Sequence, residues 1–279
     1  MKNERAGILI FVLWTLIILS LFGIAVSYNS TADIRLAKYE SAAIKSLYLA
    51  RAGMAKALAE FNKDKNDHDS LNESWNKPKE FRFGGGKVVY SAYDESARVN
   101  LNSPFLNKEH LDRLGLNDAV SQGLLDYKIK KGEKGFEFME ELFLLDGFTR
   151  ADYSKIENNV TIYRGVDPRV NINTAGENIL NIALGNDQMI KKIMEYIRGD
   201  DARAGTEDDG VFTEDNFNIV FGDFGAGTEY IAHYRALFSV KSNFFRVSAE
   251  ASFPENENKS KRITAVIDRL GKIYHWKEE

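Results

Sequence analysis

The chain has 279 residues, of which 44% are hydrophobic and 28% are charged, and its formal net charge is −4. This length and composition allow one or two globular domains with a proper core. The absence of cysteine excludes disulfides, thiolate metal sites and cysteine nucleophiles. The mild acidity does not favour a general nucleic-acid-binding protein, which carries a basic surface.

The amino-terminal segment is far more apolar than the rest of the chain. Residues 8–27 contain no charged side chain, and a helix of that length spans about 30 Å, which matches the hydrocarbon core of a bilayer. Lys2 and Arg5 precede this run, and positive charge predicts a cytoplasmic leader, with the bulk of the chain across the membrane. A helix buried in a soluble core rarely runs this far without a polar face. A cleaved secretory signal is the stronger alternative, because Ala25-Val26-Ser27 provides small residues for signal peptidase.

A helical pattern continues after the apolar run. Apolar residues recur there at spacings of three and four, with charged residues off the stripe. These apolar positions are Tyr39, Ala43, Leu47, Ala50, Met54, Leu58 and Phe61. We therefore predict one helix of about fifty residues, with 8–27 in lipid and 28–62 packed on a soluble domain. A helix cap at Ser30-Thr31 would instead divide it in two.

The segment that follows is predicted to be a loop and then a strand. Residues 62–79 are interpreted as a solvated polar connection in which His68 and the aspartates have no particular role. Residues 87–93 have the composition of a strand and follow three glycines at 84–86. Those glycines do not form a phosphate loop, which opens into a helix.

A six-residue segment occurs twice. Arg98-Val99-Asn100-Leu101-Asn102-Ser103 returns as Arg169-Val170-Asn171-Ile172-Asn173-Thr174. We interpret each copy as a short strand that ends in a helix-capping hydroxyl, with Pro104 after Ser103 and a capping box between Thr174 and Glu177. This repeat predicts that helical segments are inserted twice into a small sheet domain.

The region between and after the two copies is predicted to be mostly helical. Helices are expected near 108–115, 117–130, 136–145 and 149–158. At the carboxyl terminus, 237–253 and 261–276 are expected to be two antiparallel strands, joined by a turn at 254–258.

The segment 138–149 has the form of a helix, a turn at Gly147 and a second helix. Helix-hairpin-helix proteins hold DNA phosphates with backbone amides between two close glycines, supported by lysine or arginine. Here a second close glycine is missing, and Glu140, Glu141 and Asp146 surround the turn. We interpret the segment as a structural hairpin and do not expect nucleic acid as a partner.

An acidic loop at 200–210 is a candidate calcium site. Its carboxylates are Asp200, Asp201, Glu207, Asp208 and Asp209. Hard oxygen ligands on a flexible, glycine-containing turn suit calcium, although the spacing is not that of an EF-hand. A solvated loop explains the same residues. Residues 200–215 carry a net charge of −6, so the acidity of the chain comes from this one segment.

Catalysis finds little support. The histidines at 68, 110, 233 and 275 are far apart, and the chain has no H-x-x-x-H pair and no G-x-S-x-G motif. We expect His110 and His233 on helix surfaces and predict a protein that assembles with others and is not an enzyme.

Several segments occur in an order that resembles one family. They are a basic leader ending in Gly7, an apolar helix directly after it, LYLARAGMAKAL, SARVNLNS, FMEELFLLDGFT, RVNINTA and SNFFRVSAEASF. Over nearly the whole chain they resemble the K subunit of the type II secretion system, a minor pseudopilin also called general secretion pathway protein K. The VNINTA segment also appears in membrane-anchored DNA receptors of competence systems, and such a receptor is the alternative.

The resemblance implies an α+β fold. A single transmembrane helix continues into a pseudopilin-like long helix on a small antiparallel sheet, and a mostly helical domain, of SAM-like or helix-hairpin-helix-like type, is inserted. The implied parts are a prepilin leader at 1–7, the transmembrane helix at 8–27, its soluble half at 28–62, the sheet at 80–103 and 236–279, and the inserted domain at 104–235.

The resemblance also implies a function and partners. Prepilin peptidase would cut between Gly7 and Ile8, and the mature chain would sit in the bacterial inner membrane with its carboxyl-terminal domain in the periplasm. It would join other minor pseudopilins and the major pseudopilin at the pseudopilus tip, and meet secreted substrates or the outer-membrane secretin. A type IV pilus-associated minor pilin is a related alternative. The family binds calcium in its helical region, but the loop expected to do so is basic here, at 128–135.

The fifth mature residue would be Val12. In major pseudopilins this residue is a glutamate that pairs with the amino terminus of a neighbouring subunit. An unpaired charge in a lipid-like setting costs much free energy, and a subunit with valine here cannot neutralise the charged amino terminus of a subunit above it. This predicts a position at the tip, unless the residue merely faces lipid.

Overall fold

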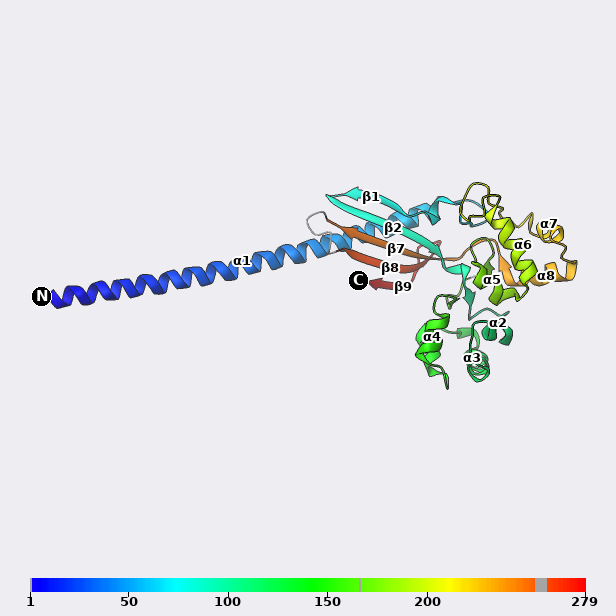
Figure 1. The fold of residues 1–279 in the computed structure, drawn as a ribbon, viewed down its shortest axis with the longest axis horizontal. Coiled ribbons are helices and arrows are strands. Elements are labelled where there is room, and N and C mark those ends of the chain that lie inside the picture. Colours follow the sequence, from blue (N-terminus) through cyan, green and yellow to red (C-terminus); the bar gives the residue numbers. More distant parts are fainter. Residues whose placement is uncertain (1, 166, 254–259) are drawn as a thin grey trace.

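The computed structural model describes residues 2–165, 167–253 and 260–279. Its longest element is helix α1 (Lys2–Phe61), which runs without a break from one end of the molecule into the folded part (Figure 1). The prediction of one continuous helix through Ser30-Thr31 is therefore confirmed.

The carboxyl-terminal part of α1 crosses one face of an antiparallel sheet with the strand order β1-β2-β7-β8-β9 (Figure 1). The five strands are β1 (Lys79–Phe83), β2 (Gly86–Asp94), β7 (Phe244–Ser252), β8 (Lys261–Asp268) and β9 (Ile273–Glu278). Burial alternates along β2, as expected for a strand with one face on a core. The α+β class and the long helix on a small antiparallel sheet are thus confirmed.

The contact between α1 and the sheet depends on small and aromatic residues. A Cβ atom on Gly53 would lie 2.8 Å from Val88 Cγ1, so glycine lets the helix backbone approach the sheet closely. Near the end of α1, the ring of Phe61 stacks on Phe245 with centroids 4.2 Å apart, and Trp75 packs edge-on against Phe245 at 5.2 Å. Because these side chains are buried, the helix and the sheet share one core.

The strands differ from the predicted ones at three places. Strand β1 was not predicted and pairs with β2 through a turn in which Gly84 and Gly85 have positive φ. The predicted strand 261–276 is two strands, because the chain turns at Gly271, which also has positive φ. The predicted strand 237–253 forms β7 only from residue 244. The predicted turn at 254–258 lies outside the described residues.

The second part of the molecule is mainly helical and lies at the end opposite the amino terminus (Figure 1). Its helices are α2 (Lys108–Arg113), α3 (Asp118–Lys131), α4 (Arg150–Ile156), α5 (Glu177–Leu184), α6 (Asp187–Arg198), α7 (Phe217–Asp223) and α8 (Thr228–Leu237). Four two-residue strands form two parallel pairs, β3 (Val99–Asn100) with β4 (Val160–Thr161) and β5 (Val170–Asn171) with β6 (Phe238–Ser239). The predicted helix at 136–145 is a 3-10 helix at Met139–Leu144.

The boundaries of the helical part lie outside the predicted 104–235. Val99 and Leu101 at one end and Phe238 and Val240 at the other are buried in the helical core, not in the core under the sheet. The strand pairs β3–β4 and β5–β6 join the beginning of each helical segment to its end. The residues of these strands therefore belong to the helical part.

Neither predicted capping hydroxyl caps a helix. Helix α2 starts only at Lys108, where Asn107 provides the cap, so Ser103 lies in the turns before it. Helix α5 follows Gly176, and the hydroxyl of Thr174 instead donates to a carboxylate. Ser103 therefore stabilises a loop, where its hydroxyl accepts from the Phe105 amide, and Thr174 stabilises the junction between the helical part and the sheet.

Candidate assembly surface and domain junction

The amino-terminal half of α1 has no partner to cover it within the described residues. An 18-residue window there has a mean hydropathy of 2.5, and none of it is buried. Each large apolar side chain gains about 1.5–3 kcal/mol when it leaves water. This helix is therefore long and apolar enough to cross a membrane, and it provides a surface that lipid or other helices must cover.

The predicted processing and filament positions all lie on this uncovered helix. Gly7 is within the helical backbone, and the side chains of Ile8 and Val12 are 64% and 46% exposed. The carbonyl of Val12 accepts a hydrogen bond from Thr15 Oγ1 at 2.8 Å, as is common in apolar helices. Cleavage after Gly7 and the role of Val12 stay predictions.

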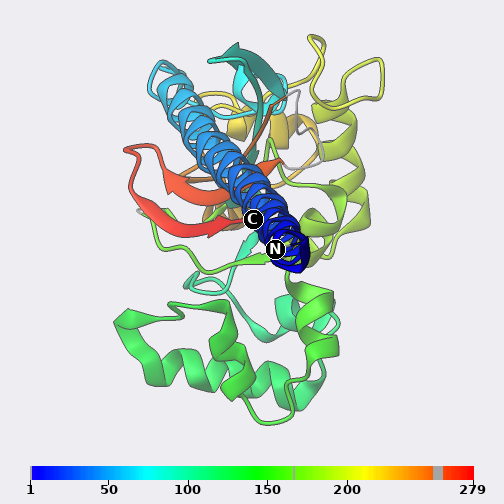
Figure 2. The ribbon, with the colours of Figure 1, turned by 90° about the vertical axis from the view of Figure 1, so that its left-hand side faces the viewer.

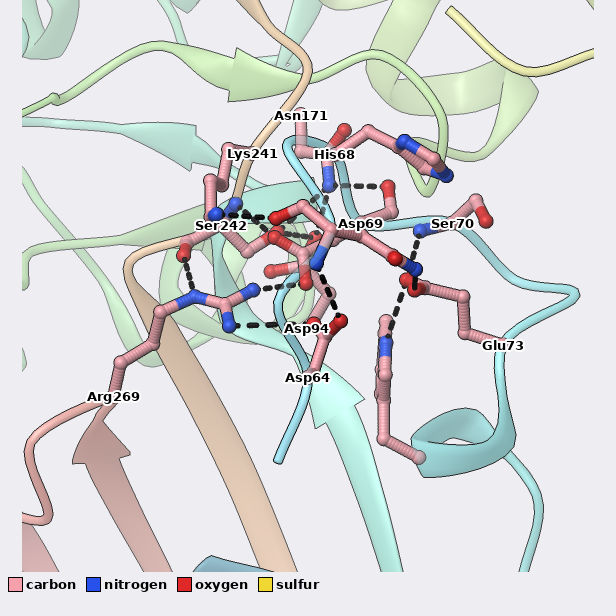
Figure 3. A network of polar contacts seen from close by, with 12 residues as sticks. Asp64, His68, Asp69, Ser70, Glu73, Asp94, Asn171, Lys241, Ser242 and Arg269 are labelled. Atoms are coloured by element: carbon pink, nitrogen blue, oxygen red, sulfur yellow. Dashed lines mark hydrogen bonds and ion pairs between the residues drawn. The ribbon is translucent and has the colours of Figure 1, made fainter. Parts of the chain in front are cut away.

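A buried carboxylate joins the sheet to the helical part. Asp94, at the end of β2, accepts hydrogen bonds on Oδ2 from Ser242 Oγ at 2.5 Å, Thr174 Oγ1 at 2.5 Å and Asn171 Nδ2 at 3.0 Å (Figure 3). Its Oδ1 accepts from the amide of Ser96 at 2.7 Å. Four donors from three segments thus converge on one side chain, which fixes the second repeat copy against the sheet.

A second buried carboxylate extends this junction to the carboxyl-terminal hairpin. Asp69 is fully buried, accepts from the amide of Ser242 at 2.7 Å, and forms an ion pair with Arg269 (Figure 3). The Arg269 guanidinium also contacts Asp64 at 3.4 Å and donates to the carbonyl of Ser242 at 3.1 Å. The loop after α1 is therefore fixed to the segments that precede β7 and follow β8, through Ser242 and Arg269.

Burial sets the protonation of both carboxylates. It raises the pKa of Asp94 to about 6, against the opposing effect of the hydroxyl and amide donors. It also raises the pKa of Asp69, although Arg269 favours the charged form. The junction is thus a place where the ionised state is costly and depends on complete hydrogen bonding.

The interpretation of 62–79 as a solvated connection is wrong in part. Asp64, Asp69 and Glu73 bring one carboxylate oxygen each within 4.8 Å of one another. However, Arg269 pairs with the first two, and Glu73 accepts from the Trp75 indole at 3.0 Å. Arg269 offsets one of the three negative charges, and Glu73 also accepts from the Ser70 amide at 2.9 Å. Protein groups therefore already hold all three carboxylates, and we interpret the residues as a structural cluster.

The acidic loop at 200–210 is ordered by its own polar groups. Asp208 accepts from the amide of Asp201 at 3.0 Å, and Asp209 accepts from the amide of Gly205 at 2.6 Å. The Thr206 hydroxyl reaches both Asp208 and Asp209, and the Asp201 amide holds the pKa of Asp208 low. Asp200 and Glu207 are exposed.

All residues of this loop are described by the structure. Among them, no three carboxylates bring an oxygen each within 4.8 Å of one another. One oxygen each of Asp201, Asp208 and Asp209 already accepts a backbone amide, so a calcium ion that gathers the carboxylates would have to rearrange the loop. Calcium at 200–210 stays a prediction.

The predicted hairpin turn contains Gly147, which has a φ of +79°. The Phe148 amide donates to the carbonyl of Leu145 at 3.2 Å, so this N–H is used inside the turn. Thr149 caps α4 in a capping box with Asp152, which orders the second helix. The exposed carboxylates of Glu140 and Asp146 flank the turn, and they would repel a phosphate.

The two repeat copies have equivalent structures. In the second copy, Asn173 donates to the carbonyl of Phe212 and accepts from its amide, both at 2.8 Å. In the first copy, Asn102 makes the same two bonds with Phe136, at 2.9 and 2.7 Å. Each asparagine side chain thus bonds to both the backbone N–H and the backbone C=O of one buried phenylalanine, as a neighbouring strand would.

The copies differ at the preceding asparagine. Asn100 donates to the carbonyl of Tyr163 at 2.8 Å, whereas Asn171 donates to Asp94 and Ser242 at the junction. Only the second copy therefore contributes this residue to the contact with the sheet.

One histidine differs from its predicted position. His110 is buried: its Nδ1 accepts the Asn107 amide at 3.2 Å, and its Nε2 lies 3.1 Å from the carbonyl of Ala183. Burial lowers its pKa, which favours the neutral form that this capping needs. His233 is exposed on α8, as expected.

Comparison with protein-family models and with curated proteins gives no match. Among solved structures, the chain is similar to a chain of the GspK-GspI-GspJ complex from the type 2 secretion system of enterotoxigenic Escherichia coli. The TM-score is 0.60 at 15% sequence identity, and the alignment covers 84% of this chain and 96% of that one. The likeness shows a GspK-like minor pseudopilin fold.

Proposed function

We propose that this chain is a minor pseudopilin of a type II secretion system. Residues 8–27 anchor it in the inner membrane, and the sheet and helical parts lie in the periplasm. It assembles with other minor pseudopilins and the major pseudopilin at the tip of the pseudopilus, where it starts or caps the filament and supports secretion.

The observation that carries this proposal is the joint presence of the GspK-like fold and an uncovered α1. The similar chain comes from a complex with GspI and GspJ, which supports other minor pseudopilins as partners. Throughout the described part of α1 before residue 42, no side chain is buried. An apolar helix of this kind requires lipid or neighbouring helices to cover it.

Two features support a position at the tip. Val12 provides no carboxylate for the amine of a subunit above. The helical part lies beyond the end of α1, on the side away from the membrane anchor (Figure 1). It would therefore project from the filament end towards secreted substrates or the secretin.

Cysteine cross-linking in cells tests the assembly directly. The chain has no cysteine, so Leu36→Cys or Ile44→Cys, each 56% exposed on α1, introduces a single reactive thiol. We expect disulfides with cysteines placed on α1 of the GspI-like and GspJ-like subunits of the same organism. Glu229→Cys, an exposed position on α8, is the matched control.

The outcome separates the alternatives. Cross-links to minor pilins of a type IV pilus, and not to secretion subunits, would assign the chain to the pilus. Failure of both α1 cysteines to react with any pilin-like helix, while the subunits are present, would contradict an assembly role.

A further inference from the structure

Strand β9 forms an open edge of the sheet. It pairs with β8 on one side, and within the described residues no strand pairs with the other side. Arg262 and Glu279 exchange both backbone hydrogen bonds, and such pairs alternate along an antiparallel ladder. The N–H and C=O groups of Trp276 and Glu278 therefore point outward, and all six residues of β9 are exposed. An extended segment of another chain could pair there.

A cleft of about 400 Å³ adjoins this edge on the sheet face opposite α1. Figure 2 shows the carboxyl-terminal strand (red) at the border of the sheet, above the lobe that contains α3 and α4. Four aromatic residues line the cleft: Tyr274 of β9, Phe138, Tyr153 and Tyr163. The Tyr163 and Tyr274 rings are 6.2 Å apart and nearly perpendicular.

The arginines that line the cleft, Arg98 and Arg246, share one buried carboxylate. Glu95 is 2% exposed and accepts two bonds of 2.9 Å from the Arg246 guanidinium. It also lies 3.5 Å from Arg98. The two arginines therefore share one buried carboxylate, which leaves one positive charge against the two carboxylates of Glu140 and Glu157 in the same lining.

Two carboxylates at the cleft have no ion-pair partner within the described residues. Glu140 and Glu157 line it and form no ion pair with any residue that the structure describes. Burial is the main cause that raises the pKa of Tyr153, and the negative charge of Glu140 adds to it. Burial also raises the pKa of Tyr163 to about 12, with further contributions from the negative charges of Glu95 and Glu140. The aromatic rings and the carboxylates of Glu140 and Glu157 line the same cleft.

We propose that the β9 edge and this cleft together bind an extended segment of a partner protein that carries a basic side chain. The segment adds a strand to β9, and its lysine or arginine enters the cleft. There the cation stacks on tyrosine faces and pairs with Glu140 and Glu157. This inference does not depend on the assembly role of α1, which lies on the other face of the sheet.

A peptide titration of the full chain in lipid nanodiscs tests the proposal. The probe is a fluorescein-labelled peptide, Thr-Val-Thr-Arg-Thr-Val-Thr, and the matched peptide has neutral citrulline in place of arginine. Fluorescence anisotropy should show binding of the arginine peptide that is at least about tenfold tighter than that of the citrulline peptide. N-methylation of alternate residues, which removes the donors to β9, should weaken binding similarly.

Variants locate the site on the chain. Glu140→Gln with Glu157→Gln should remove the preference for arginine over citrulline, while Glu229→Gln, an exposed carboxylate on α8, should leave it unchanged. Equal affinity of the two peptides, or a preference that survives the double substitution, overturns the cation site. Equal affinity of the N-methylated peptide overturns strand addition. Absence of binding at about 1 mM peptide overturns the proposal as a whole.

Discussion

The asparagine contacts of the two repeat copies predict a large and local effect of substitution. Asn173 is 2% exposed, and its side chain satisfies both backbone groups of Phe212, which is fully buried. In Asn173→Ala, this N–H and this C=O lose their partners where water does not reach. Each unsatisfied buried group costs about 1–3 kcal/mol, so the loss is about 2–6 kcal/mol. This is a large part of the stability of an ordinary domain.

Hydrogen exchange measured by mass spectrometry is the suitable assay. None of the three tryptophans lies in the helical core, so fluorescence would miss a local change. A loss of 2 kcal/mol corresponds to about thirtyfold faster exchange through unfolding, and we expect at least this in peptides that contain Phe212. Asn102→Ala should act in the same way around Phe136.

Asn178→Ala is the matched control. Its side chain is exposed and makes one bond, to Asn159 at 2.9 Å, so exchange near Phe212 should stay as in the unmodified chain. Wild-type exchange at Phe212 in Asn173→Ala would refute the reasoning that this asparagine holds the second helical segment.

Three further predictions follow from the packing, the junction and the acidic loop. Gly53→Ala places a methyl group 2.8 Å from Val88 Cγ1, so the free energy of unfolding in denaturant should fall by about 1–3 kcal/mol; an unchanged value would contradict the close contact. Because the pKa of Asp94 is raised to about 6 in the folded state, the native chain binds more protons than the unfolded one between about pH 4 and 6. The contribution of Asp94 to the free energy of unfolding is therefore fully present near pH 4, and about 3 kcal/mol of it is lost as the pH rises through 6. Asp94→Asn should remove this dependence of stability on pH; a dependence that persists would show that another group causes it. Calorimetric titration with calcium should give heat that disappears in Asp208→Ala/Asp209→Ala; no heat with the unmodified chain would end the proposal for this loop.

Long periodic features of the fold could be predicted from the sequence. The apolar run and the three-and-four spacing from Tyr39 to Phe61 predict one continuous helix, which the structure confirms. The prediction that all of 28–62 packs on the soluble domain is wrong in part, because no residue from 28 to 45 is buried and the covered part of α1 begins at Ser46. The strand-like composition of 87–93 predicts β2. The turn at Gly271 also had a signal, since a glycine interrupts the alternation after Leu270.

The junction could not be predicted in this way. Asp94 meets Ser242 across 148 positions, and Asp69 meets Arg269 across 200. Single polar residues in loops carry no periodicity, and their role depends on which segments the sheet brings together. For the same reason the sequence predicts solvated acidic residues at 62–79, whereas Asp69 is buried.

The repeat illustrates both cases. Its two copies are visible in the sequence, and equivalent strands follow from them. The partners of Asn102 and Asn173 lie 34 and 39 positions away and belong to no shared motif. The sequence therefore indicates the duplication, whereas the function of the asparagines requires the structure.

Coexpression with prepilin peptidase tests the central claim most directly. The claim requires the chain to be processed as a pseudopilin, so mass spectrometry should show a loss of seven residues and Ile8 as the new amino terminus. Gly7→Trp, which obstructs backbone approach to the peptidase, should leave the full-length chain. An amino end that stays intact beside an active peptidase, or cleavage after Ser27, would contradict the assignment.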